Sequence, residues 1–284
     1  MSAADVLREA RHYLAFQRAL AGPVRYLGPA GTASRVAAAA PAVTAEEPAA
    51  TSFVTDATGP MPPDLFGAAP DPSTDPALSP YARIEALIPE DSPLKAMTSL
   101  EEIRDWMQQT VLVPIDQHRI KPVLGTGDPN ADLVVIGEAP GADEDREGEP
   151  FVGRAGQLLN KILEAIHFKR EEVYITNILK SRPPNNRDPL PEETAAHIPV
   201  LYKQIALIQP KVLLAVGKTA GNALLGRSSA MGTLRGKFHD FYGLPLMVTY
   251  HPAALLRNPD WKRPTWEDVK LLRTRYDQIV AATR

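Results

Sequence analysis

The sequence contains no cysteine. This absence excludes disulfide bonds, a cysteine nucleophile, thiolate zinc sites and iron–sulfur clusters held by cysteine. No apolar run approaches the roughly 18–20 residues that a membrane-spanning helix needs, and the N-terminus lacks the apolar block of a signal peptide. We therefore expect a cytoplasmic protein that does not enter a membrane. A mitochondrial transit peptide, suggested by the arginines and alanines of residues 1–35, is the weaker alternative.

The excess of positive charge that often marks nucleic-acid binding is also missing, because the formal net charge is −3. The charge is unevenly distributed along the chain. Residues 1–35 carry +3, residues 36–94 carry −8 and residues 95–284 carry +2. Any binding of phosphate groups must therefore come from local patches rather than from the net charge.

Composition divides the chain into three regions. In residues 1–35, apolar side chains at helical spacing over 3–22 predict an amphipathic helix, which either docks on the main domain or binds a partner protein. Residues 36–94 hold eleven prolines and nine acidic residues, which predicts a flexible acidic linker. A second hypothesis is that this linker mimics the charge of DNA and covers the active site. Residues 95–284 are predicted to form the folded domain.

The folded domain shows strands that alternate with helices. We predict strands at 133–136, 173–177, 212–216 and 246–250, and helices at 99–109, 156–166, 191–208, 218–225 and 266–282. This order favours an α/β fold, a three-layer α/β/α sandwich with a central and mainly parallel sheet. In such sheets the ligand binds at the carboxyl ends of the strands.

The first motif follows the strand predicted at 133–136. Residues 137–141 read Gly-Glu-Ala-Pro-Gly and residues 150–156 read Pro-Phe-Val-Gly-Arg-Ala-Gly. The spacings of a Walker loop and of a dinucleotide fingerprint are absent, so we reject binding of a nucleoside triphosphate. The loop offers backbone amides, carboxylates and the ring of Phe151, which suit a flat base and a water molecule. The structural alternatives are core packing for Phe151 and a helix cap or solvated charge for Glu144.

The second and third motifs also begin where predicted strands end. Asn177 could form a turn, but its carboxamide can also accept from uracil N3–H and donate to uracil O4, a pattern that cytosine reverses. Residues 249–257 read Thr-Tyr-His-Pro-Ala-Ala-Leu-Leu-Arg. A lone His-Pro is more often structural. Coupled to Leu-Leu-Arg, His251 makes sense as a hydrogen-bond donor to a leaving base, beside an apolar wedge and a phosphate contact.

Taken together, these motifs resemble the uracil-DNA glycosylase superfamily, and most closely its family 4, over residues 110 to 259. The resemblance implies an enzyme that flips uracil out of DNA and hydrolyses its N-glycosidic bond, leaving an abasic site. It acts on uracil-containing DNA, as a monomer by default. The implied residues are Glu138, Glu144 and His251 for catalysis; Ala139, Gly141, Phe151 and Asn177 for uracil binding; and Arg187, Leu255, Leu256 and Arg257, with Lys262 and Arg263, for DNA binding.

The departures from the resembled family concern its [4Fe–4S] cluster. Thr110, Val113, Ser181 and His197 stand where family 4 places the four cluster cysteines. We therefore expect no metal and no cofactor, with packing and hydrogen bonds in the place of the cluster. Ala254 stands where many relatives have a tyrosine, which bears on the shape of the wedge.

Three other functions stay open on the sequence. The chain could be a DNA-binding scaffold that lost catalysis together with the cluster. It could be a glycosylase for hypoxanthine, xanthine or a modified pyrimidine. A nucleotide hydrolase is disfavoured, because no phosphate-binding motif is present.

Overall fold

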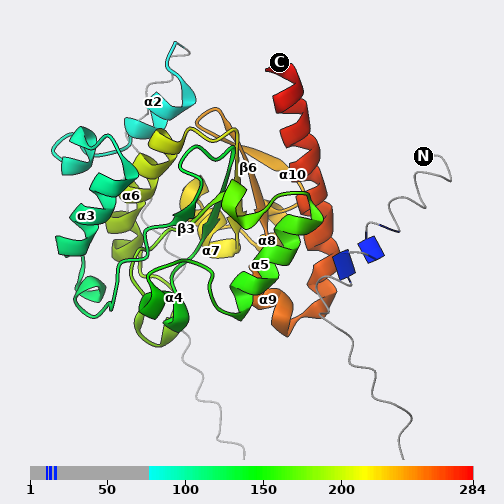
Figure 1. Ribbon diagram of the computed structural model, residues 1–284, viewed down its shortest axis with the longest axis horizontal. Coiled ribbons are helices and arrows are strands. Elements are labelled where there is room, and N and C mark those ends of the chain that lie inside the picture. Colours follow the sequence, from blue (N-terminus) through cyan, green and yellow to red (C-terminus); the bar gives the residue numbers. More distant parts are fainter. Residues whose placement is uncertain (1–10, 12, 15, 18–76, 284) are drawn as a thin grey trace, which may run out of the picture.

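The computed structural model describes residues 11, 13, 14, 16, 17 and 77–283 (Figure 1). A six-stranded sheet with the order β1-β3-β2-β4-β6-β5 forms its centre. The four inner strands are parallel, and β1 and β5 pair antiparallel at the two edges. The strands are β1 (Thr126–Gly127), β2 (Leu133–Gly137), β3 (Tyr174–Asn177), β4 (Val212–Val216), β5 (Phe238–Phe241) and β6 (Leu244–Thr249).

Helices cover both faces of this sheet, so the predicted three-layer α/β/α fold with a mainly parallel sheet is confirmed. Figure 1 shows α3 and α6 on one side, and α5 and α10 on the other. The α-helices are α2 (Pro80–Glu85), α3 (Leu100–Gln109), α4 (Ala142–Glu147), α5 (Arg154–Ala165), α6 (Pro191–Ile208), α7 (Lys218–Leu225), α8 (Met231–Leu234), α9 (Pro252–Arg257) and α10 (Lys262–Ala282). Short 3-10 helices are η1 (Pro93–Ala96), η2 (Pro114–Gln117), η3 (Arg170–Glu172), η4 (Pro184–Asn186) and η5 (Pro259–Trp261).

The core has two halves because side chains alternate along each strand. On β2, Val134 and Ile136 pack with α3, α6 and α7, whereas Leu133 and Val135 pack with α5 and α10. All five residues of β2 and of β4 are buried. Such continuous apolar strands are typical of a parallel sheet covered on both faces.

The folded domain begins earlier than the boundary that we predicted at residue 95. Helix α2 packs on α6, and Ile84, Ile88 and Leu94 are buried in the core. The hydroxyl of Tyr81 donates to the carbonyl of Pro210 at 3.1 Å. The high proline and acid content of residues 36–94 predicted a linker, so the apolar residues near its end were not assigned to the core. The rest of the predicted linker, residues 36–76, lies outside the described residues.

The described residues of the predicted N-terminal helix are helical. Phe16 is fully buried, and its ring lies 4.8 Å from that of Trp266 on α10. The guanidinium of Arg263 lies over the ring of Tyr13. At these residues the helix packs on the main domain, as the docking alternative expects. The role of residues 1–35 as a whole stays a prediction. No helix in the described part of the chain has both the length and the apolar character needed to cross a membrane.

Candidate active site

The predicted site residues gather at the carboxyl edge of the parallel strands. Asn177 ends β3, Gly137 ends β2, and His251 follows β6 by two residues. Gly137 pairs with Asn177 in the sheet register. The parallel topology therefore brings together three motifs that lie far apart in the sequence.

Asn177 and Phe151 meet above Gly137. A Cβ atom at position 137 would lie 2.3 Å from Asn177 Oδ1 and 2.6 Å from Phe151 Cζ, so only glycine fits there. Asn177 is 1% exposed, and its Oδ1 atom is buried with no hydrogen-bond partner among the described residues. A buried acceptor without a partner is costly to a fold. Its place beside an aromatic ring suits a ligand that donates a hydrogen bond.

Phe151 is held in an unusual backbone conformation, with φ at 55°. A non-glycine residue in this region carries strain that often marks a functional site. Arg170 donates to the carbonyls of Pro150 at 2.7 Å and Phe151 at 3.2 Å. A Cβ atom at Gly156 would lie 1.7 Å from the Phe151 carbonyl oxygen, so that helix start also needs glycine. Arg170 was missed in the sequence, where it looks like an ordinary surface cation.

His251 caps the N-terminus of α9. Its Nδ1 atom accepts from the backbone N–H of Ala253 at 3.2 Å, which leaves the proton of the neutral ring on Nε2. Burial lowers the pKa of His251 to about 4, and the charge of Arg257 adds to this effect. The ring lies 5.5 Å from that of Phe151. At neutral pH this arrangement supplies an uncharged N–H donor beside the aromatic ring.

Glu138 follows β2 directly. Burial raises the pKa of its carboxyl group above the ordinary value; a hydrogen bond with Thr219 opposes this shift, the charge of Asp188 adds to it, and that of Lys218 opposes it. A partly desolvated carboxyl group with a raised pKa at a strand end is a candidate general base.

The carboxylate of Glu144 binds backbone N–H groups of its own loop, whereas we predicted that it orients water. One carboxylate oxygen accepts from the backbone N–H groups of Val152 and Gly153, at 3.0 and 3.1 Å. The other accepts from Gly141 N at 3.1 Å. Both oxygens therefore tie the two ends of the loop together, which is the helix-cap alternative. The amide of Gly141, predicted to bind uracil, is engaged by Glu144. Ala139 lies two residues beyond β2 and packs against the core.

The segment after His251 contains the predicted DNA contacts. Leu255 is fully buried in the core with α5 and α10, so a role as an apolar wedge would require it to leave this packing, and that role stays a prediction. The next residue, Leu256, is 43% exposed, and Arg257 is exposed. Trp261, which the sequence reading missed, is 37% exposed and stacks on Tyr250 with ring centroids 4.6 Å apart.

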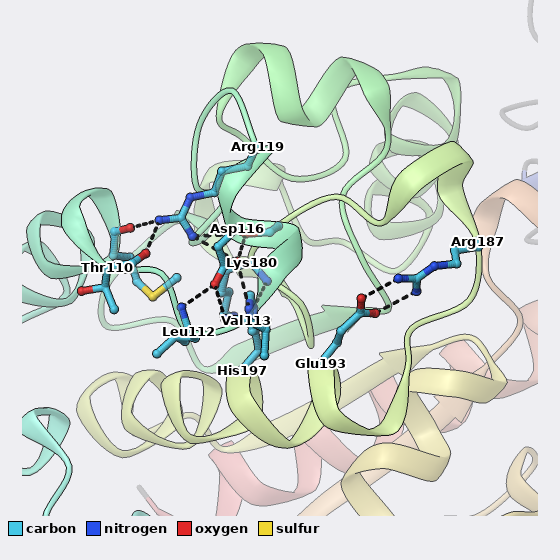
Figure 2. Close-up of polar contacts among 11 residues, drawn as sticks. Thr110, Leu112, Val113, Asp116, Arg119, Lys180, Arg187, Glu193 and His197 are labelled. Carbon is cyan, nitrogen blue, oxygen red and sulfur yellow. Dashed lines mark hydrogen bonds and ion pairs between the residues drawn. The ribbon is translucent and has the colours of Figure 1, made fainter.

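Arg187 is paired with an acid rather than free to bind phosphate. Its guanidinium makes two hydrogen bonds to the carboxylate of Glu193, at 2.6 and 2.9 Å (Figure 2). The predicted DNA contact would have to compete with this ion pair.

Asp268 on α10 supports the strand end that carries His251, and it is fully buried. Its carboxylate accepts from the hydroxyl of Thr249 at 2.7 Å, from the guanidinium of Arg235 at 2.9 and 3.0 Å, and from Gly236 N at 3.0 Å. Thr249 is the last residue of β6. These partners lie 19 to 33 residues away in the sequence, so no local signal marks Asp268.

The four positions of the cluster cysteines do not form a metal site here. Val113 is apolar, and the hydroxyl of Ser181 donates to Asp116. The Nδ1 atom of His197 accepts from Lys180 N at 2.7 Å. Within the described part of the chain, no group of three or more His, Asp or Glu residues is arranged to hold a metal ion. None of the four positions carries the thiolate that an iron–sulfur cluster needs, so the residues present do not fit such a cluster.

Comparison with known proteins identifies relatives of this domain. The family model described as "Uracil DNA glycosylase superfamily" matches residues 124–270. A type-4 uracil-DNA glycosylase of Sulfurisphaera tokodaii is 38% identical over 62% of this chain and 84% of that protein. One from Thermotoga maritima is 39% identical over 60% of this chain and 91% of that protein. A type-5 uracil-DNA glycosylase of Thermus thermophilus is 34% identical over 46% and 68%, respectively.

Proposed function

The chain belongs to the uracil DNA glycosylase superfamily, and from this premise we propose that it repairs DNA by hydrolysing the bond between uracil and deoxyribose. The observation that carries the proposal is the buried Oδ1 atom of Asn177, which has no hydrogen-bond partner in the described part of the chain and lies beside the ring of Phe151. The type-4 relatives, 38–39% identical, support the same reaction.

Recognition follows from the geometry around Asn177. The extruded uracil stacks on Phe151, and its N3–H donates to Asn177 Oδ1. The amide nitrogen of Asn177 donates to uracil O4. Cytosine presents an unprotonated N3 and an amino group at these two positions, so the same carboxamide orientation rejects it.

Cleavage develops negative charge on uracil and positive charge on the sugar. The neutral His251 donates from Nε2 to uracil O2 as the C1′–N1 bond breaks, and it stabilises the uracil anion. Glu138 orients water and accepts its proton as the oxygen bonds to C1′. The products are an abasic site and uracil, which takes up a proton at N1.

Duplex DNA must open before this reaction. Leu256 fills the gap that the flipped nucleotide leaves in the stack, and Trp261 adds apolar surface next to it. Arg257, with Lys262 and Arg263, binds phosphates on either side. Unpaired DNA requires no such wedge.

The expectations of a monomeric enzyme and of a cytoplasmic location remain predictions, and light scattering tests the first.

We further propose that this enzyme works without an iron–sulfur cluster. The support is chemical, because none of Thr110, Val113, Ser181 and His197 supplies a thiolate. An assay of iron and acid-labile sulfide in the purified, active protein tests this proposal. Stoichiometric iron and sulfide would refute it and leave the glycosylase proposal standing.

The activity test uses end-labelled oligonucleotides with one uracil opposite guanine, opposite adenine or unpaired, followed by alkali. Wild-type protein should create alkali-sensitive sites, and His251→Ala should be slower by about 10²–10³-fold, the usual loss for one donor to a developing anion. The matched control is His118→Ala at an exposed position. Intact but bound uracil DNA would favour the scaffold alternative, and oligonucleotides with hypoxanthine or xanthine test the other base preferences.

A further inference from the structure

A buried polar chain connects the former cluster positions with the base-reading residue. His197 Nε2 lies 3.1 Å from Asp116 Oδ1, a close contact without hydrogen-bond alignment. His197 Nδ1 accepts from Lys180 N at 2.7 Å, and Lys180 Nζ donates to the carbonyl of Asn177 at 2.7 Å. Asp116, Lys180 and His197 are each at most 4% exposed. Figure 2 shows these three side chains in one cluster between η2 and α6.

Asp116 anchors the end of this series of polar contacts that lies farther from Asn177. Its Oδ2 atom accepts from the backbone N–H groups of Leu112 and Val113, at 2.8 and 3.1 Å. Its Oδ1 atom accepts from the hydroxyl of Ser181 and lies 3.3 Å from the Arg119 guanidinium. Burial opposes ionisation of Asp116, but the close contact with His197 and the hydrogen bond from Ser181 outweigh it and hold its pKa well below the ordinary value.

Arg119 extends this anchor to α3. Its guanidinium donates to the carbonyls of Met107 and Thr110 and to the hydroxyl of Ser181. Two of the four cluster positions, Thr110 and Ser181, are therefore joined through one arginine. Together, Asp116 and Arg119 tie the segment 110–119 to residue 181 with hydrogen bonds alone.

Lys180 forms the proximal end, and it is fully buried. Its Nζ atom donates to Thr176 Oγ1 at 2.8 Å, to Asn177 O at 2.7 Å and to Gln204 Oε1 at 2.7 Å. These three oxygens surround the amine of Lys180, and burial lowers its pKa well below the ordinary value. Gln204 lies on α6, so the lysine joins the end of β3 to the helix that carries His197.

Base reading leaves little freedom at this strand end. The Oδ1 atom of Asn177 fits beside Gly137 only because no Cβ is present there. A misplacement of about 1 Å at a reacting site can lower a rate by about 10²-fold. An apolar side chain at position 180 would fill the same space without burying a polar amine, but it would not fix the direction of the Asn177 carbonyl.

We propose that Asp116, His197 and Lys180 act as positioning residues that hold Asn177 for uracil recognition. The inference rests on the proposed function and deepens it. These residues do not touch the substrate, so they act through the main chain of Asn177. In this chain, hydrogen bonds at the former cluster positions thereby become part of base recognition.

The decisive variant is Lys180→Met, which keeps the length of the side chain but removes all three donated hydrogen bonds. We expect its single-turnover excision rate to fall by about 10–100-fold. Its affinity for DNA without uracil should stay within about twofold of wild type, because the phosphate and wedge contacts use other residues. Both are measured well below the melting temperature of the variant, with circular dichroism as the check of folding.

Lys203→Met is the matched control. Lys203 is 4% exposed on α6, but its amine bonds Glu85 and the carbonyl of Lys95 instead of Asn177. This variant should lose stability and keep the wild-type rate. Equal fractional losses of rate in both lysine variants would show a general structural effect and overturn the proposal.

A second pair of variants tests the His197 link and decides the matter if Lys180→Met does not fold. His197→Asn keeps an acceptor for Lys180 N, whereas His197→Ala removes it. We expect a slow rate in the alanine variant and a substantial recovery in the asparagine variant. Equal excision rates in the alanine and asparagine variants would refute the positioning role of His197.

The wild type, assayed in parallel, separates the two levels of inference. If wild-type protein leaves uracil in place under all conditions, the proposed function fails, and the positioning role of these residues fails with it. If wild type excises uracil and Lys180→Met is equally fast, only the positioning role is wrong.

Discussion

Replacement of His251 by asparagine should reveal how strongly the fold disfavours a proton on this ring. Asn is a good N-cap, and its side-chain oxygen can accept from Ala253 N as Nδ1 of His251 does. The variant therefore keeps the cap of α9 and removes the titrating group. Any constant change in stability from lost ring packing against Phe151 is present at every pH.

The sign follows from the lowered pKa. The pKa of His251 is about 4 in the fold, against an ordinary value of 6.5 in the unfolded chain. Between these values the unfolded chain binds a proton that the folded protein does not. Stability from this group is therefore complete above pH 6.5, and it is lost as the pH falls towards 4.

The magnitude follows from the same two values. With a pKa of about 4 in the fold and 6.5 in the unfolded chain, the loss relative to pH 7 is about 2 kcal/mol at pH 5 and about 3 kcal/mol at pH 4. Other groups titrate equally in wild type and variant, so they cancel in the difference. The free-energy difference between His251→Asn and wild type should thus shift by about 3 kcal/mol in favour of the variant between pH 7 and pH 4.

Urea unfolding at pH 7, 6, 5 and 4, followed by circular dichroism, measures this difference. His118→Asn, at an exposed position, controls for the removal of a histidine in general. Stability curves of wild type and His251→Asn that run parallel over this range would refute the reasoning, because His251 would then titrate alike in the folded and unfolded chains.

Three further predictions concern packing and support. Leu255→Ala should lower the free energy of unfolding by about 2–5 kcal/mol. Leu256→Ala should change this free energy by no more than about 0.5 kcal/mol in urea unfolding, but it should slow excision more from duplex than from single-stranded DNA. Equal effects of the two variants would contradict the assignment of Leu255 to the core and Leu256 to the wedge. Gly156→Ala should abolish excision, because its Cβ would overlap the carbonyl oxygen of Phe151, and retained wild-type activity would show that the loop can move. Asp268→Asn should cost up to about 3–5 kcal/mol in urea unfolding, since it leaves the partly exposed guanidinium of Arg235 without its counter-charge. A loss below about 1 kcal/mol would argue against this support.

Local patterns in the sequence were sufficient for the central strands and most of the long helices. Strands β2 and β4 are continuous apolar runs, and α6 and α10 show the expected helical pattern. The edge strands β1 and β5 were missed. They are short and only partly buried, so they lack the apolar run that marks an inner strand.

The site could be predicted where a residue type carries its own chemistry. Asn177 ends a strand, and Phe151 and His251 lie in glycine- or proline-containing segments that follow strands. The parallel sheet brings these strand ends to one edge. Glu144 could not be assigned in this way, because a carboxylate that caps a loop and one that orients water look alike in a sequence. Only the three backbone N–H groups around Glu144 distinguish the two roles.

The sequence by itself determined the fold class, the family resemblance and the absence of any thiolate for a cluster. The tertiary structure alone decided which of Leu255 and Leu256 faces solvent and which contacts the residues at the four cluster positions make. Neighbouring leucines on a helix differ by their rotation about its axis, and the packing of α9 on α5 sets that rotation. The contacts of Lys180 with Gln204 and of Ser181 with Asp116 join residues 24 and 65 positions apart. No local pattern encodes such pairs, because they form only when the chain has closed around its core.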